Sequence, residues 1–140
     1  MSEQPSSPSP TLGYAILYVE DVASQLEFYE QAFGLARRFF QDEGGKAYGE
    51  LETGAARLAF ASLSLAVEHL GEKPVLPDPS RAPLAFEIAL VVDDVEARYA
   101  HAVAAGAVPV SAPAIKPWGQ TVAYVRDRLG YLVELCTVME

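Results

Sequence analysis

The side chains in this sequence that are best suited to chemistry are mostly acidic. The 140 residues carry 19 Asp and Glu against 10 Lys and Arg, with two His, one Cys and one Trp. The resulting formal charge of −9 repels phosphate backbones, which argues against nucleic acid as a partner. Carboxylates attract cations, so the balance favours a cationic small-molecule ligand, although an acidic surface also serves solubility alone.

The residues that usually build disulfides or metal centres are scarce. Cys136 is the single cysteine, so no internal disulfide can form, and a reducing, cytoplasmic location is expected. His69 falls in a predicted linker region and His101 on a predicted helix, so both are expected at the surface. We find no charged-then-apolar leader and no apolar run long enough to span a bilayer, so no membrane partner is expected.

The single tryptophan is a candidate ligand contact. Trp118 precedes a glycine in a loop just before the last predicted hairpin. An exposed tryptophan in such a place often covers a ligand, but it can equally cover the edge of a sheet. Both interpretations remain open.

Two stretches of the chain share one pattern and predict the same local structure. From 13 to 19, and again from 86 to 92, apolar and β-branched residues favour a strand. Asp21 and Asp94, which are 73 positions apart (94 − 21), then suit helix N-caps before apolar residues spaced for one helix face. Extended runs follow near 37–41, 46–52 and 57–65 in the first half, and near 108–111, 120–126 and 131–138 in the second. The chain therefore reads as a duplicated strand–helix–three-strand module.

Composition sets the predicted boundaries. Residues 1–11 are rich in Ser and Pro and are expected to be a flexible tail. The four prolines of "GEKPVLPDPSRAP" predict a linker at 73–83, between a module at 12–72 and a module at 84–139. A chain of this size buries one core, so 12–139 is predicted as a single α+β domain. Two such modules side by side would leave a concave trough between their curved mixed sheets.

The last hairpin carries a family resemblance. With "PWGQTVAYVRDRLGYLVEL" near its end, the duplicated chain resembles the vicinal oxygen chelate superfamily over residues 12–139. This superfamily includes glyoxalase I, extradiol dioxygenases, fosfomycin-resistance enzymes and the bleomycin-resistance binding proteins. The most specific segment, "DRLGYLVEL", resembles the family's Asp-Pro-x-Gly turn, with Arg128 in place of the proline.

The resemblance implies where a metal would be held. In metal-using members the ligands come from the first and last strand of each module. Those positions are Tyr14 and Glu87 on the first strands, and Phe60 and Glu134 on the last. Transition metals favour three or four N or O donors, commonly with imidazole, and phenylalanine supplies none. We therefore expect no cofactor and no tightly held metal, with a divalent hard cation held by Glu87, Glu134 and water as the alternative.

Turn geometry extends the candidate site. A type I turn with a glycine bulge at Asp127–Gly130 would place Tyr124 opposite Glu134. The matching turn at 53–57 would place Glu50 opposite Phe60. The predicted ligand-binding residues are Tyr14, Glu50, Phe60, Glu87, Trp118, Tyr124 and Glu134. The alternative is that the aromatic residues only fill the core and the glutamates contact solvent.

Two functions compete. The first is a non-catalytic protein that binds an antibiotic-like, cationic or aromatic small molecule by stacking and charge pairing, similar to the bleomycin-resistance branch. The second is a metal-dependent lyase or dioxygenase, in which a divalent ion would hold two substrate oxygens and a glutamate would move a proton. A regulatory or structural protein without a small ligand is a third, weaker hypothesis.

A homodimer is expected, because sheet edges and outer helix faces would otherwise stay exposed. The resemblance allows two arrangements: the modules pair within one chain, or they exchange between two chains. The predicted linker is long enough for either.

Overall fold

A computed structural model describes residues 8–139. Residues 1–7 of the predicted tail lie outside this part of the chain. The first half contains β1 (Tyr14–Val19), α1 (Val22–Phe33), β2 (Ala36–Glu43), β3 (Lys46–Glu52), β4 (Arg57–Ser62) and α2 (Leu63–Leu70). The second half contains β5 (Ile88–Val91), α3 (Val95–Ala104), β6 (Val108–Ile115), β7 (Thr121–Arg126) and β8 (Leu132–Cys136).

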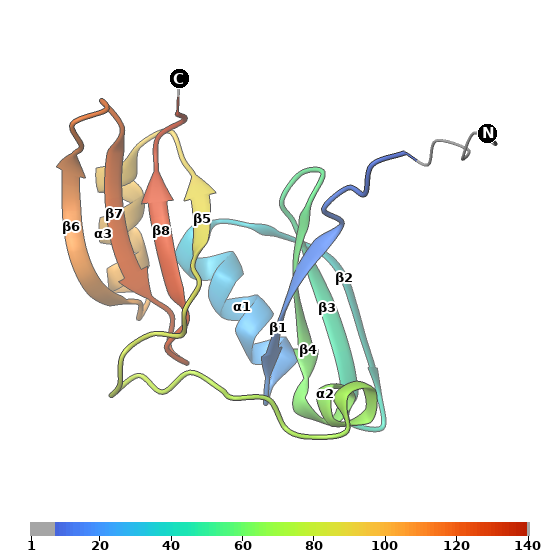
Figure 1. The fold of residues 1–140 in the computed structure, drawn as a ribbon. Helices are drawn as coiled ribbons and strands as arrows, with labels where there is room; N and C mark the ends of the chain where they lie inside the picture. Colours follow the sequence, from blue (N-terminus) through green and yellow to red (C-terminus); the bar gives the residue numbers. More distant parts are fainter. Residues whose placement is uncertain (1–7, 140) are drawn as a thin grey trace, which may run out of the picture.

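Each half builds one four-stranded mixed sheet with the same topology. The strand orders are β1-β4-β3-β2 and β5-β8-β7-β6. The first strand of each half pairs in parallel with the last, and the remaining pairs are antiparallel. Figure 1 shows the two sheets with β1 and β5 as the edge strands nearest each other and α1 between them. This α+β duplication confirms the fold class predicted from the repeated sequence pattern.

Local signals in the sequence place both long helices. The Asp21 side chain accepts a hydrogen bond from the Ser24 backbone N–H, and Asp94 does the same for Ala97. These bonds satisfy amide groups that the first turn of a helix leaves unpaired. Gly34 ends α1 with a positive φ of 70°, which a residue without Cβ adopts at low cost.

Helix α1 covers one face of the first sheet and also packs against α3. Its buried side chains include Leu26, Tyr29 and Phe33. Together with Val133 and Leu135 from the second sheet, they belong to one cluster of buried apolar residues. The helix-covered faces of both sheets therefore meet in a shared core, and the opposite faces remain for a site.

The segment after β4 differs from the prediction. Residues 57–65 were expected to be extended, but the strand ends at Ser62 and Leu63–Leu70 form α2. Ser62 has extended backbone at the N-cap, Ala66 is buried, and Gly71 ends the helix with φ of 82°. His69 therefore lies on a helix rather than in the linker. None of the described helices is long and apolar enough to cross a membrane.

The turn between β7 and β8 joins the two halves. Asp127 is fully buried, and its carboxylate accepts hydrogen bonds from the side chains of Gln25 and Tyr29 of α1, both at 2.7 Å. The Tyr131 hydroxyl donates to the Tyr18 carbonyl of β1, also at 2.7 Å. Arg126 donates to carbonyls of the linker, including that of Arg81. These contacts link the second half to α1, β1 and the linker.

Candidate functional site

Three of the predicted residues meet on the helix-free face of the second sheet. Tyr124 on β7 lies directly opposite Glu134 on β8, and its hydroxyl donates to Glu134 Oε1 at 2.9 Å. Glu87 comes just before β5, which pairs with β8, and its carboxyl group lies close enough to that of Glu134 for each to affect the other's pKa. The turn supports this register, because the Asp127 N–H donates to the Tyr131 carbonyl and Gly130 has φ of 106°. The predicted pairing of Tyr124 with Glu134 is confirmed.

The pKa values of the two neighbouring carboxyl groups are shifted in opposite directions. Partial burial, followed by the neighbouring Glu134, raises the pKa of Glu87 to about 7. Burial also opposes the charge on Glu134, but hydrogen bonds from Glu87 and Tyr124 outweigh it and lower the pKa of Glu134. Just below neutral pH, Glu87 therefore stays protonated beside an ionised Glu134. The pair carries one negative charge there and two at higher pH.

The surroundings of the pair favour charge stabilisation over nucleophilic chemistry. Burial, then Glu134, raises the pKa of the Cys136 thiol to about 11, so the sulfur stays protonated. Burial and the hydrogen bond to Glu134 raise the pKa of Tyr124 to about 12. Lys116, in the segment before β7, lies near enough to favour the charge on Glu134. Because the thiol and the phenol stay protonated, the negative charge that a ligand would meet here is carried by the carboxylates.

Trp118 lies in the connection between β6 and β7, whereas Glu134 lies on β8 and Glu87 just before β5. Its indole N–H donates to the Gln120 side-chain oxygen at 2.8 Å, and Gln120 in turn donates to the Thr137 carbonyl at 2.9 Å. The side chain is thereby held in place, yet 63% of the residue is exposed. An immobilised, exposed indole suits stacking on a ligand.

The first sheet places its predicted residues differently. Tyr14 is 57% exposed at the start of β1. Glu50 on β3 accepts from the Tyr48 hydroxyl at 2.7 Å and lies 3.4 Å from Arg38 Nε. Arg38 also contacts Glu52, so guanidinium charge compensates the carboxylates on this sheet. Glu50 is therefore a weaker candidate for a cationic ligand than the pair on the second sheet.

The prediction that Phe60 faces the trough is wrong. Phe60 is fully buried against Tyr29 of α1, with the ring centroids 4.9 Å apart. It pairs with Gly49, whereas Glu50 pairs with Ala59. The reason is the turn at 53–56, which is one residue shorter than the turn at 127–131. A one-residue change of register moves a side chain to the other face of a strand.

Ala59 therefore occupies the first-half position that matches Glu134. It pairs with Ile16 of β1, just as Glu134 pairs with Ala89 of β5. An alanine side chain can neither bind a ligand by charge nor coordinate an ion.

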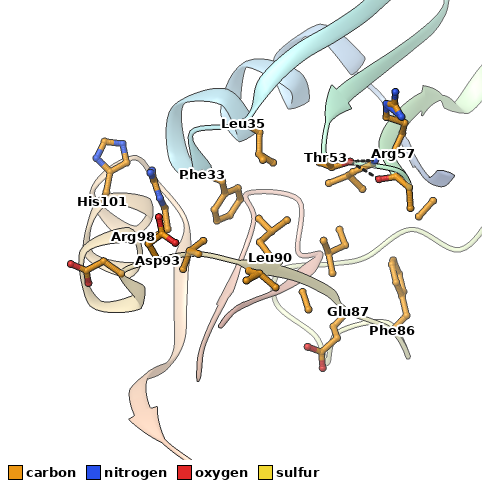
Figure 2. A pocket seen from close by; sticks show the side chains of 18 of the residues that line it. Phe33, Leu35, Thr53, Arg57, Phe86, Glu87, Leu90, Asp93, Arg98 and His101 are labelled. Atoms are coloured by element: carbon orange, nitrogen blue, oxygen red, sulfur yellow. Dashed lines mark hydrogen bonds between the residues drawn. The ribbon is translucent and has the colours of Figure 1, made fainter. Parts of the chain in front are cut away.

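A cleft lies between the edge strands of the two sheets. β1 pairs with β4 and β5 with β8, and the two four-stranded sheets do not join into one. Between them lies a cleft of about 1090 Å³, open to solvent (Figure 2). Its apolar lining includes Ala15, Phe33, Leu35, Leu58, Phe86, Ile88 and Leu90. Glu87 lies at the rim of this cleft, with its carboxyl group pointing away from the apolar lining (Figure 2).

The chain belongs to the Glyoxalase/Bleomycin resistance protein/Dioxygenase superfamily, whose family model matches residues 11–135. A comparison with curated proteins found no match.

Solved structures of this superfamily share the fold. A glyoxalase-related enzyme from Fulvimarina pelagi is 21% identical, covers 91% of this chain and 88% of its own, and has a TM-score of 0.75. A glyoxalase/bleomycin resistance protein/dioxygenase family enzyme from Burkholderia phytofirmans is 21% identical. The match covers 92% of this chain and 99% of the Burkholderia chain, with a TM-score of 0.73. TioX from Micromonospora sp. ML1 is 22% identical. The match covers 91% of this chain and 98% of the TioX chain, with a TM-score of 0.66. At these identities the likeness shows the fold alone.

The residues present do not fit the metal centre that the superfamily implies. Of the four expected ligand positions, Glu87 and Glu134 supply carboxylates, while Tyr14 and Ala59 supply a phenol and a methyl group. His101 on α3 is hydrogen-bonded to the Gln31 carbonyl of α1 at 2.7 Å. Within residues 8–139, no three His, Cys, Asp or Glu side chains gather in a form suited to a metal ion. Two carboxylates without imidazole are a poor donor set for zinc, nickel or iron.

Proposed function

We propose that this protein binds a cationic or aromatic, antibiotic-like small molecule without altering it. The observation that carries the proposal is the Glu87–Glu134 pair, in which Glu134 accepts a hydrogen bond from Tyr124 and Glu87 lies at the rim of a large cleft. A ligand cation that approaches the pair can displace the proton held by Glu87. The cation then forms charge-assisted hydrogen bonds with the two carboxylates. Phe86, 46% exposed at the same rim, offers a ring for stacking.

The proposal that the protein does not alter its ligand rests on which metal-binding and nucleophilic side chains the site contains. Ala59 and Tyr14 leave a divalent ion without the ligands that the resemblance leads us to expect. The Cys136 thiol, with its raised pKa of about 11, is protonated and unsuited to nucleophilic attack. What remains is a set of groups that bind and orient a cation.

A paired screen tests this proposal. Bleomycin-like glycopeptides and other cationic aromatics would be compared with glyoxal adducts and catechols, following Trp118 fluorescence and substrate turnover in the same samples. Binding without catalysis predicts saturable quenching by the cationic aromatics and no turnover of any compound. Metal-dependent consumption of a glyoxal adduct or catechol that Glu134→Gln abolishes would overturn it.

The second candidate is a metal-dependent lyase or dioxygenase of the same superfamily. One observation favours it: a glutamate whose pKa is raised to about 7 is suited to act as a general base near neutral pH. A bell-shaped or single-step pH dependence of turnover centred near that value would support this candidate.

We also propose a cytoplasmic homodimer. The buried, unpaired Cys136 suits a reducing compartment. All eight residues of β2 are exposed, including Phe39 and Phe40, so this edge can pair with a second copy. Light scattering after gel filtration at several concentrations tests the assembly, and a single monomeric mass throughout would exclude it.

A further inference from the structure

The two outer edges of the structure differ in what they offer to another chain. Figure 1 shows β2 and β6 at opposite ends, each with a single neighbouring strand. Strand β6 contains Pro109 and Pro113, which have no backbone N–H, and its pairing with β7 shifts register twice. Strand β2 contains no proline and one shift, between Arg37 and Phe39. Its unpaired edge is therefore a template on which another strand can form hydrogen bonds.

The order of charges along β2 is asymmetric. The strand reads ARRFFQDE, so it is basic at its start and acidic at its end. At the basic end, Arg37 lies 2.7 Å from Glu30 of α1, and Arg38 lies 3.2 Å from Glu52 of β3. Both arginines are thus held in place by carboxylates of their own chain.

The acidic end of β2 has no such compensation. Asp42 accepts a hydrogen bond from the Gly45 N–H at 3.0 Å, and Glu43 accepts one from the Gln41 side chain. Within residues 8–139, no Lys, Arg or His side chain forms an ion pair with Asp42 or Glu43. A cation supplied from outside this chain would complete the end of the strand.

The register with β3 shows which β2 side chains share a face. Arg37, Phe40 and Asp42 pair with alternate residues of β3, from Leu51 to Ala47, and both of these end residues are buried. Because alternate residues of a strand point to one side, the three β2 side chains lie on the same face. On that face the Arg37 guanidinium lies over the Phe40 ring, 5.7 Å from its centroid.

We propose that two copies of the chain pair through β2, antiparallel, about a two-fold axis at Phe40. The two Phe40 rings then contact each other. Arg38 is the extra residue of the bulge between Arg37 and Phe39, so Arg37 of each copy comes opposite Asp42 of the other. The pattern is self-complementary, as a two-fold interface requires, and one continuous sheet crosses both copies. This inference rests on the proposed homodimer and specifies its surface and register.

Reversal of one charge tests the register by sedimentation. Asp42→Lys turns both Arg37–Asp42 pairs into like-charge pairs, so dimerisation should weaken by about tenfold or more. Arg37→Glu should have a similar effect, because it brings a carboxylate opposite Asp42. Glu96→Lys is the matched control, since it makes the same change of charge at an exposed residue of α3 and should leave the dimer unchanged. Circular dichroism checks that each variant keeps its secondary structure.

A mixture of the two variants gives a sharper test. Arg37→Glu and Asp42→Lys each repel themselves, but in a mixed dimer Arg37 of one copy meets Asp42 of the other, and the two introduced side chains form the second pair. We expect a heterodimer in the mixture at concentrations where each variant alone is monomeric. Native mass spectrometry identifies it by its mass. Loss of the dimer in both variants without recovery in the mixture would overturn the register.

Cross-linking locates the two-fold axis. Opposite residues of an antiparallel pair have Cα atoms about 4.5–5.5 Å apart, which suits a disulfide. Phe40→Cys should therefore give a covalent dimer under mild oxidation, and the native Cys136 is buried. Glu43→Cys is the control, because this register places it far from its own copy. Failure of Phe40→Cys to cross-link, or equal cross-linking of both variants, would contradict an axis at Phe40.

The outcomes distinguish this inference from the homodimer on which it rests. A wild-type dimer that the β2 variants leave as tight as Glu96→Lys does would overturn the inference and leave the homodimer standing on another surface. A wild-type protein that sediments as a monomer at every concentration would overturn both, and would leave the β2 edge to a different partner.

Discussion

Tyr124 and Glu134 face each other across β7 and β8, with the tyrosine hydroxyl 2.9 Å from the carboxylate. Their counterparts on β3 and β4 are Glu50 and Ala59. The duplicated modules are therefore alike in backbone and unlike in chemistry. The second module holds the carboxyl pair of Glu87 and Glu134. The first module adds aromatic side chains and carboxylates whose charge is compensated by guanidinium groups.

Removal of the Glu134 charge should weaken ligand binding. Glu134→Gln keeps the shape of the side chain and is expected to cost on the order of 1–3 kcal/mol in the binding of a cationic aromatic, as for a charge-assisted contact. The same change removes a like charge beside Glu87, so the pKa of Glu87 should fall from about 7 toward its usual value. Fluorescence titration and NMR of the side-chain carboxyl measure the two effects. An unchanged Glu87 titration would mean that the carboxyl groups do not meet.

Cation affinity should increase as pH rises through about 7. Glu87 loses its proton in that range, so the pair changes from one negative charge to two. In Glu87→Gln this step should disappear while binding through Glu134 persists. Affinity measured from mildly acidic to alkaline pH, with a ligand that does not titrate, checks the prediction. A flat wild-type profile contradicts it.

The same residue should couple folding to pH. The pKa of Glu87 is raised from an ordinary value of 4.5 to about 7 in the folded protein, so between these values the folded state binds more protons than the unfolded state. The contribution of Glu87 to stability is fully present below that window and is lost as pH rises through it. Urea unfolding of wild type and Glu87→Gln should therefore diverge in slope against pH only across this window.

Substitutions on the two faces of the first sheet should differ in how much they lower the free energy of unfolding. Phe60→Ala empties a fully buried position against Tyr29 and should lower the free energy of unfolding by about 3–5 kcal/mol. Tyr14→Ala, at a residue 57% exposed, should change it by no more than about 0.5 kcal/mol. Denaturant unfolding of the two variants decides whether Phe60 lies in the core. Equal, small effects would restore Phe60 to the ligand-facing side.

The Asp127 contacts should hold the two halves in their observed arrangement. Asp127→Ala leaves the buried side chains of Gln25 and Tyr29 without their acceptor, and unfolding should become easier by at least about 2 kcal/mol. Gln31→Ala, on the exposed side of α1, serves as the control and should cost little. Stability equal to wild type in Asp127→Ala would show that the halves are joined by apolar packing alone.

Sequence signals that act over short distances predicted the fold well. The two Asp caps and the period of apolar residues located α1 and α3, and the Asp127–Gly130 turn fixed the pairing of Tyr124 with Glu134. Phe60 was misplaced because the internal alignment assumed turns of equal length. Helix α2 was missed because an apolar run after a strand is equally compatible with a continued strand, until Ser62 is known to cap a helix.

The duplicated pattern predicted a trough between the two sheets, but the residues that line the cleft could not be predicted from the sequence. The two halves are joined by contacts such as those of Asp127 with Gln25 and Tyr29, which are about a hundred positions away in the sequence. No local pattern encodes contacts at such a separation. The pairing of Glu87 with Glu134 was expected because the resemblance placed both on neighbouring strands of one module.

The most direct test of the account is binding of a cationic aromatic to protein stripped with a strong chelator and assayed by elemental analysis. We predict well under one equivalent of zinc, nickel, iron or manganese before stripping, saturable one-to-one binding that the chelator leaves unchanged, and loss of affinity in Glu134→Gln. Stoichiometric metal in the isolated protein, together with ligand binding that disappears on stripping and returns when the metal is added back, would contradict it.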